Sequence, residues 1–369
     1  MRILVAPDKF AGTLTAPEAA AAIAAGWRRR APDDELDLVP MADGGPGFVE
    51  VLHESLGGRV VPASVRGPFG ESVRGSVLLV GDTAYVESAQ ACGLHLTERR
   101  EPERATTYGV GQLLLAARDA GARRIVVGLG GSGTNDGGAG LLAALGASAD
   151  RPLDQGVAGL EGITCAEVPI AHGPLADVEL VAASDVDNPL TGLFGATKVF
   201  GAQKGVREED MPRWDAALQQ LAAATDRVTA TAPGAGAAGG LGFALLLLGA
   251  TRRAGVDVVA DAVGLADRAR AADLVVTGEG SFDPQSSGGK APAGVARVAA
   301  EALRPCVVLA GRVAVGAREM RALGVEAAYS LLDTVGEERA FGEPTGALAE
   351  LAERVARTWS RASGPAAER

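Results

Sequence analysis

The chain has 369 residues, of which 46 are acidic and 35 basic, and its net charge at pH 7 is −11. Because binding to a phosphodiester backbone relies on clustered Lys and Arg, this charge and the lack of a basic stripe argue against nucleic acid as a partner. The longest apolar run, 241–250, contains glycine and is too short to cross a bilayer, and the length favours two domains over one.

Cysteine usage indicates a reducing compartment. The three cysteines have no C-x-x-C spacing, and the N-terminal residues already have the pattern of a strand. We therefore expect a cytoplasmic protein. The three scattered histidines do not have the spacing of zinc ligands. The sequence does not distinguish a monomer from a homodimer.

The first 60 residues read as two strand and helix units. Residues 2–6 form an apolar strand, and Thr15 with Glu18 makes a capping box for a helix that continues to about Arg30. A strand at 35–40 and a helix at 48–56 follow. Each strand ends in an acid-bearing loop, and ligands of open α/β sheets bind at such ends. These loops hold Asp8 with Lys9, and Asp43, which could alternatively cap a helix.

The pattern changes between residues 59 and 89. Alternating runs separated by Gly-Pro and Gly-Asp turns predict antiparallel strands, which indicates a domain boundary. Glu87 ends the last of these strands, where its carboxylate is either functional or in a salt bridge.

A glycine-rich loop then separates a strand at 125–127 from a helix that Asp136 opens, after an earlier helix at 106–121. Such a junction directs backbone N–H groups and the positive end of a helix dipole at one point, which suits a phosphate. Gly128, Gly130 and Gly133 match G-x-G-x-x-G, but no second strand ending in an acid follows, which argues against dinucleotide binding here. A tight structural turn is the other interpretation.

The strand within 178–189 ends in Asp185 and Asp187. Carboxylates two residues apart on an extended segment point to the same side, and such pairs often hold Mg²⁺ with substrate oxygens. An Asx turn before Pro189 is the alternative for either residue. Gln203 and Lys204 follow between two glycines, and residues 207–225 are expected to form a surface helix.

A second glycine run precedes an apolar segment that we predict as a helix over 241–253. Gly234, Gly236 and Gly239 again match G-x-G-x-x-G, and Asp261 stands about where a ribose-binding acid would. This favours the alternative function of an NAD(P)-dependent oxidoreductase. The preceding residues make a poor buried strand, however.

Strand and helix alternation returns near residue 273, with strands at 274–277, 306–310 and 327–331 and a helix from about 293. One loop carries Glu279, Asp283, Gln285 and Lys290. Pro284 and Ala291 exclude a Walker A motif, but Lys290 can still neutralise phosphate charge.

Eight ordered motifs together resemble the type I glycerate kinases: APDKFAGTLTA, PMADGGPG, TTYGVGQLL, GLGGSGTNDGGAG, DVDNPLTG, FGAQKG, PGAGAAGG and TGEGSFDPQSSGGKAP. The resemblance implies phosphorylation of D-glycerate by ATP with Mg²⁺, typically at the 2-hydroxyl. It also implies two α/β domains. One is flavodoxin-like, with a parallel sheet (1–60 plus 262–369), and the other is a mixed-sheet α/β domain inserted into it (61–261), with the active site in the cleft between them.

Site residues follow from the motifs and the resemblance. The catalytic set is Asp43, Asp185, Asp187, Asp283 and Lys290, with Asp185 and Asp187 as metal ligands. The nucleotide set is Gly130, Gly131, Ser132, Thr134, Asn135, Asp136, Gly137, Gly138, Gly236 and Gly239. The substrate set is Asp8, Lys9, Glu87, Gln203, Lys204, Glu279 and Gln285. Asp43 or Asp283 would accept the hydroxyl proton, and Lys9 and Lys204 are candidates for the glycerate carboxylate.

The chain departs from the family pattern at several positions. Ala11 stands where the family usually has Lys, Pro46 replaces a usual Glu, and Gly133 a usual Ala. Ser281 and Phe282 replace a usual Arg-Ile pair. This last change removes a cation near the expected site.

Overall fold

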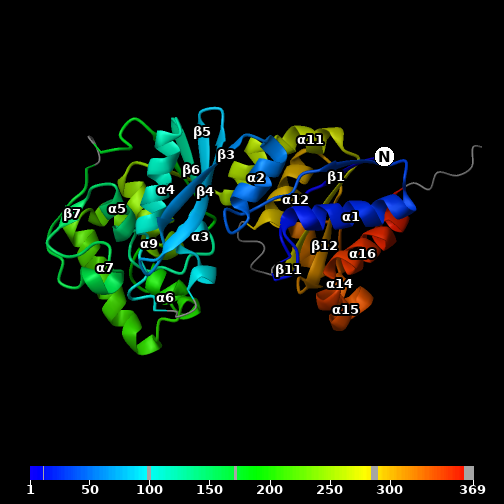
Figure 1. The fold of residues 1–369 in the computed structure, drawn as a ribbon. Coiled ribbons are helices and arrows are strands. Elements are labelled where there is room, and N and C mark those ends of the chain that lie inside the picture. Colours follow the sequence, from blue (N-terminus) through cyan, green and yellow to red (C-terminus); the bar gives the residue numbers. More distant parts are fainter. Residues whose placement is uncertain (11, 98–100, 170–172, 284–289, 361–369) are drawn as a thin grey trace, which may run out of the picture. The chain divides into compact units, whose positions relative to one another are not determined.

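The computed structural model describes residues 1–10, 12–97, 101–169, 173–283 and 290–360 (Figure 1). The predicted α/β class is confirmed, with one parallel and one mixed sheet. Two compact units divide the chain: unit 1 comprises residues 1–43, 50–56 and 256–369, and unit 2 comprises 44–49 and 57–255. The domain boundaries and the active-site cleft predicted from the sequence stay predictions.

Unit 1 is built on a parallel sheet with the strand order β13-β12-β11-β1-β2. The strands are β1 (Arg2–Val5), β2 (Glu35–Leu38), β11 (Leu274–Phe282), β12 (Cys306–Val313) and β13 (Ala327–Ser330). Numbered within the unit, this is the flavodoxin-like order 2-1-3-4-5. The strand order therefore reverses between β1 and β11, and ligands of such sheets bind at that switch point.

Helices cover both faces of this sheet. On one face α1 (Ala16–Arg30) lies beside α16 (Pro344–Trp359), and both pack on a core that includes Ile3 and Val276 (Figure 1). The two helices approach so closely that a Cβ on Gly26 would lie 1.9 Å from the Ala349 carbonyl oxygen. The remaining helices are α2 (Phe48–Leu56), α10 (Gly255–Ala262), α11 (Leu265–Ala271), α12 (Ala291–Glu301), α13 (Ala317–Ala322), α14 (Leu331–Val335) and α15 (Glu337–Gly342).

The predicted capping box at the start of α1 is confirmed. The Glu18 amide donates to Thr15 Oγ1 and the Thr15 amide donates to Glu18 Oε2 over 2.8 Å, which satisfies two backbone donors that the first helical turn leaves open.

Unit 2 contains the mixed sheet, in the order β10-β9-β6-β5-β4-β3. The strands are β3 (Arg59–Arg66), β4 (Ser72–Val80), β5 (Thr83–Glu87), β6 (Arg124–Gly128), β9 (Glu179–Ala183) and β10 (Thr251–Arg253). The predicted antiparallel run is confirmed for β3, β4 and β5, and the pairs from β5 to β10 are parallel. A short antiparallel pair, β7 (Ser148–Ala149) and β8 (Ala166–Glu167), lies apart from this sheet.

The α-helices of unit 2 are α3 (Ala89–Cys92), α4 (Tyr108–Asp119), α5 (Ala139–Ala144), α6 (Ala196–Phe200), α7 (Met211–Ala224), α8 (Arg227–Ala230) and α9 (Ala237–Leu247). The prediction of one helix over 241–253 was wrong at its end. Gly249 takes a φ of +88°, a left-handed conformation that suits glycine, and the chain then enters β10. None of the helices in the described ranges has the length and apolarity needed to cross a bilayer.

Candidate functional site

Acidic and basic side chains gather at the carboxyl edge of the unit 1 sheet. Asp8 and Lys9 follow β1, Asp43 follows β2, and Glu279 belongs to β11, next to β1. The Asp8 amide donates to the Gly278 carbonyl oxygen over 2.8 Å, which ties the loop after β1 to β11 at the point where the strand order reverses. We call Asp8, Lys9, Asp43, Glu279, Asp283 and Lys290 the acid–lysine cluster.

Asp8 is the buried member beside Lys9. The Lys9 amide donates to Asp8 Oδ1 over 2.7 Å, and Lys9 Nζ lies 3.9 Å from Oδ1 of both Asp8 and Asp43. Burial raises the pKa of Asp8 to about 6, against the lowering by Lys9, with a further rise from Asp43 and a lowering by Lys290. A carboxyl group with this pKa changes its protonation close to neutral pH.

Lys290 joins the cluster from the residue before α12. Its Nζ lies 3.7 Å from Asp283 Oδ1 and 3.9 Å from Glu279 Oε2, and Glu279 is almost fully buried. The cluster thus combines four carboxylates with two ammonium groups, a formal excess of two negative charges. Such a group can accept a proton, neutralise phosphate oxygens and attract a divalent cation.

The glycine-rich loop of unit 2 lies against residues 44–46. A Cβ on Gly130 would lie 2.5 Å from the Gly45 Cα atom, and one on Gly131 would lie 2.7 Å from the Pro46 ring. Gly131 also has a φ of +75°. Close packing between two backbone segments therefore accounts for these glycines without a ligand, which favours the structural interpretation left open by the sequence.

Asp136 supplies an anion at the start of α5. Its fully buried carboxylate accepts from the amides of Gly138 and Gly140 over 3.0 and 3.2 Å, and from the amide and hydroxyl of Thr107 over 2.8 and 2.9 Å. Burial raises the pKa of Asp136, and these hydrogen bonds act in the opposite direction. Donors that the sequence suggested for a phosphate thus bind a carboxylate of the chain itself.

Lys204 lies beneath the same loop. Its Nζ donates to the Thr134 carbonyl oxygen over 2.6 Å and to Ser132 Oγ over 3.1 Å, and the side chain is almost fully buried. Burial lowers the pKa of Lys204 to about 8, while Cys92 and Asp136 act to raise it. The predicted neighbour Gln203 is exposed.

Asn135 places a buried amide in the loop. Its Nδ2 donates to Thr197 Oγ1 over 2.9 Å, whereas its Oδ1 has no hydrogen-bond partner among the described residues. Gly137 follows with its amide donating to the Gly239 carbonyl oxygen. The loop is therefore fixed by its own side chains and by the second glycine run.

Glu87 takes part in a similar local network. Its buried Oε2 accepts from the amides of Gly47 and Val49 over 3.1 and 3.4 Å, at the start of α2. These backbone bonds support a structural role, whereas the sequence suggested a functional carboxylate or a salt bridge. The assignment of Glu87 to the substrate set stays a prediction.

Asp185 and Asp187 have different partners. Asp185 Oδ1 accepts from the Gly255 amide over 2.9 Å, at the start of α10, whereas Asp187 is exposed and forms an ion pair with Arg252 over 2.7 Å. Within the described ranges, no group of three or more His, Cys, Asp or Glu side chains is arranged to hold a metal ion. The assignment of these two residues to Mg²⁺ stays a prediction.

The second glycine run does not follow a strand. It comes after α8, and Ala238, Gly239 and Gly240 take left-handed conformations at the start of α9. A Cβ on Gly239 would lie 2.0 Å from the Thr134 carbonyl oxygen, and one on Gly236 would lie 2.3 Å from the Pro189 carbonyl oxygen. The strand and helix context that a dinucleotide fingerprint needs is absent here. Gln285 and Ala11 lie outside the described residues.

Thr107 is a residue whose importance the sequence analysis missed. It holds Asp136 through both its amide and its hydroxyl, and the hydroxyl also accepts from the Leu141 amide over 3.0 Å. Its place in the motif TTYGVGQLL was the available signal. The partner lies 29 positions further along the chain, so spacing alone could not identify the pair.

Comparisons with known proteins agree on one family. The model of the glycerate kinase family matches residues 3–360. A glycerate kinase from Haemophilus influenzae is 40% identical over 91% of this chain and 93% of that protein. A glycerate 2-kinase from Escherichia coli is 39% identical over 91% of this chain and 92% of that protein.

A solved structure supports the same assignment. The crystal structure of a protein from Salmonella typhimurium LT2, assigned as glycerate kinase 2, has a TM-score of 0.81 and 38% sequence identity and covers 97% of this chain and 98% of that chain. The resemblance inferred from eight motifs is therefore confirmed, and the chain is an enzyme that belongs to the glycerate kinase family.

Proposed function

We propose that this enzyme transfers the γ-phosphoryl group of ATP to the 2-hydroxyl of D-glycerate, with Mg²⁺. The observation that carries the proposal is the acid–lysine cluster at the switch point of the unit 1 sheet. Phosphoryl transfer requires a protein to position the reactants, neutralise charge on the phosphate oxygens and accept a proton. The cluster offers lysines for the first two tasks and carboxylates for the third.

The charged side chains divide these tasks. Lys290 neutralises charge on the transferred phosphoryl group, and Lys9 binds the glycerate carboxylate. Asp8 accepts the hydroxyl proton as the hydroxyl oxygen attacks phosphorus and ADP leaves. Asp43 and Asp283 were the acceptors favoured by the sequence, but a pKa of about 6 suits Asp8 better, because a base works best when its pKa lies near the operating pH.

The residues present fit a magnesium ion by charge and donor type. Carboxylate oxygens are its preferred protein ligands, and Mg²⁺ bound with a nucleotide usually keeps several waters and takes only one or two carboxylates. Glu279 and Asp283, which flank Lys290, would hold it in unit 1. When bound, the ion would lower the charge on the phosphate oxygens. This choice has more support than Asp185 and Asp187, whose carboxylates have separate protein partners.

The nucleotide role of residues 130–138 has weaker support. Asp136 and Lys204 are engaged within the fold, and glycines 130 and 131 are explained by packing. Gly236 and Gly239 are explained in the same way. We keep these residues as a secondary nucleotide contact.

A coupled assay of ADP release tests the proposal. The wild-type protein with ATP, Mg²⁺ and D-glycerate should turn over, and omission of any one of the three should stop it. ADP release that is indifferent to D-glycerate would contradict the substrate. An absorbance change of NAD(P)H with a hydroxy acid and without ATP would instead support the oxidoreductase alternative.

A further inference from the structure

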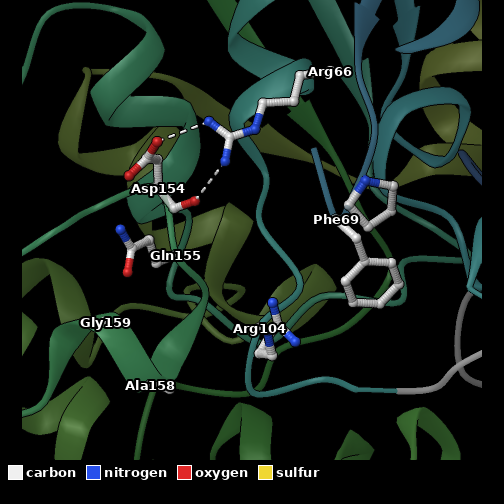
Figure 2. A pocket seen from close by; sticks show the side chains of 8 residues that line it. Arg66, Phe69, Arg104, Asp154, Gln155, Ala158 and Gly159 are labelled. Carbon is white, nitrogen blue, oxygen red and sulfur yellow. Dashed lines mark hydrogen bonds and ion pairs between the residues drawn. The ribbon is translucent and has the colours of Figure 1, made fainter. Parts of the chain in front are cut away.

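A cavity of about 350 Å³ lies in unit 2, formed by residues that take no part in the acid–lysine cluster (Figure 2). Three segments surround it: the end of β3 with the following turn, the turn before α4, and residues 154–159, which include the start of a 3-10 helix (Val157–Leu160). The residues that line it are Arg66, Pro68, Phe69, Arg104, Asp154, Gln155, Ala158 and Gly159.

Backbone contacts fix the walls of this cavity. The Thr106 amide donates to the Pro68 carbonyl oxygen over 3.0 Å, and the Ala158 amide donates to the Glu103 carbonyl oxygen over 2.9 Å. A Cβ on Gly156 would lie 2.4 Å from the same Glu103 oxygen. The three segments therefore hold one another in place, and the cavity is largely formed before any ligand arrives.

Arg66 forms one side of the cavity in a fixed orientation. Its Nη1 donates to Asp154 Oδ2 over 2.8 Å and its Nη2 donates to the Asp154 carbonyl oxygen over 3.2 Å, as Figure 2 shows. The guanidinium also lies 5.0 Å from the centre of the Tyr108 ring. The two bonds use two of the five N–H donors of the guanidinium, which leaves three for another acceptor.

Arg104 and Phe69 both line the cavity (Figure 2). In the described structure Arg104 Nη1 forms an ion pair with Glu101 Oε2 at 3.4 Å on the surface. Exposed ion pairs of this kind contribute little to stability. A guanidinium binds a carboxylate or phosphate group through paired donors. Two arginines and an aromatic ring thus line one cavity in a chain of net charge −11, and the Asp154 carboxylate offsets the charge of Arg66.

We propose that this cavity binds a small organic anion. Its carboxylate or phosphate group accepts hydrogen bonds from Arg104 and Arg66, and its apolar body packs against Phe69 and Pro68. The volume is at the lower end of that of ligand pockets, which restricts the ligand to a small molecule. This inference does not depend on the proposed function, because it concerns other residues and is measured by binding.

Phenyl phosphate, which joins a phosphate to one ring, is a suitable probe for calorimetric titration of the full chain. We expect it to bind more tightly than inorganic phosphate, and we expect benzyl alcohol, which lacks the charge, not to bind. Arg104→Gln should weaken phenyl phosphate at least tenfold, and Phe69→Ala should reduce its affinity to that of inorganic phosphate. Because Arg104 is exposed, its replacement should leave folding and turnover unchanged.

Two controls make the test specific. Arg74→Gln removes an exposed arginine of β4 that does not line the cavity, so it should leave the affinity unchanged. Lys290→Met should also leave it unchanged, which separates this cavity from the acid–lysine cluster. Equal affinity in wild type and Arg104→Gln, loss of binding in Lys290→Met, or no binding at millimolar phenyl phosphate would each overturn the proposal.

Discussion

The acid–lysine cluster of unit 1 and the glycine-rich loop of unit 2 use the same residue types in different ways. In the cluster, the ammonium and carboxylate groups lie 3.7–3.9 Å apart, and Lys9, Asp43, Asp283 and Lys290 are partly exposed. In the loop, Asp136 and Lys204 are buried and have hydrogen bonds of 2.6–3.2 Å.

We propose that this difference distinguishes charged groups that act on a ligand from charged groups that hold the fold together. Asp136 and Lys204 are buried and take part in short hydrogen bonds, which leaves them little freedom to bind anything else. Lys9 and Lys290 are partly exposed and lie at longer ion-pair distances, so each ammonium group can turn toward a ligand. Asp8 combines both features, because it is buried and accepts from the Lys9 amide over 2.7 Å. The sequence motifs assigned residues of both regions to the functional site. Substitutions in each region should therefore have opposite signatures, with loss of stability in the loop and loss of turnover in the cluster.

Asp136→Ala should produce the largest effect on stability. The substitution leaves three backbone amides and one hydroxyl without their acceptor in a buried site, and we expect a loss of about 3–5 kcal/mol in the free energy of unfolding. Urea denaturation measures it. The matched control is Asp119→Ala, an exposed aspartate at the end of α4, which should change stability by less than about 0.5 kcal/mol. A similar small change in Asp136→Ala would contradict the structural role.

Lys290→Met should produce the largest effect on turnover in the cluster. Removing a cation that stabilises transition-state charge typically lowers kcat by roughly 100- to 1000-fold. Steady-state rates of ADP release measure it, with the melting temperature as a check on folding. Lys198→Met, on the exposed surface of α6, is the control and should keep the wild-type rate. A near-normal rate in Lys290→Met would remove this lysine from the site.

Asp8→Asn should stabilise the protein while it slows the reaction. The folded-state pKa of about 6 lies above the ordinary 3.8, so the folded state binds more protons between these values and stability falls as pH rises through that window. At pH 7 wild-type Asp8 is charged and buried, which lowers the stability of the folded state, and asparagine removes this cost. We expect a net gain of about 1–2 kcal/mol in the free energy of unfolding, after the loss of the contact with Lys9 is counted. Denaturation at pH 4 and pH 7 should show the gain at pH 7.

The same variant should turn over about 100-fold more slowly, because an amide cannot accept the proton. Asp267→Asn, an exposed residue of α11, should change neither quantity. Lower stability of Asp8→Asn at pH 7 than that of wild type would show that Asp8 is a structural residue like Asp136.

Lys204→Met should alter the pH dependence of stability. The folded-state pKa of about 8 lies below the ordinary 10.5, so the unfolded state binds more protons between these values and wild-type stability rises with pH there. Proton linkage predicts that the free energy of unfolding of the wild type rises by about 1.5 kcal/mol between pH 8 and 9.5. This rise should be missing from Lys204→Met and present in Lys198→Met. Identical slopes in wild type and Lys204→Met would show that burial does not lower the pKa of Lys204.

Local signals predicted much of the fold. The capping box of Thr15 and Glu18 is a contact between residues three positions apart, and the strands around residues 59–87 are separated by turns that glycine and proline determine. The flavodoxin-like unit followed from family motifs and was confirmed by the strand order. The end of α9 was missed because the apolar run continues past Leu247, and only the conformation of Gly249 stops the helix.

The roles of charged loop residues were harder to predict. Asp136 looked like the start of a phosphate-binding helix, but its partner Thr107 comes from another segment. The glycines at 130 and 239 looked like ligand contacts, although they face backbone atoms of Gly45 and Thr134. The arginine pair at positions 66 and 104 had no sequence signal, because three segments far apart in the sequence form its cavity.

The most direct test of the central claim is phosphorus and carbon NMR of the product formed by the wild-type protein from ATP, Mg²⁺ and ¹³C-labelled D-glycerate. We predict a phosphate ester on carbon 2, in which phosphorus couples to carbons 1, 2 and 3 of glycerate, together with one ADP for each ester formed. ATP hydrolysis to free phosphate with unmodified glycerate would contradict the claim that this family member phosphorylates glycerate.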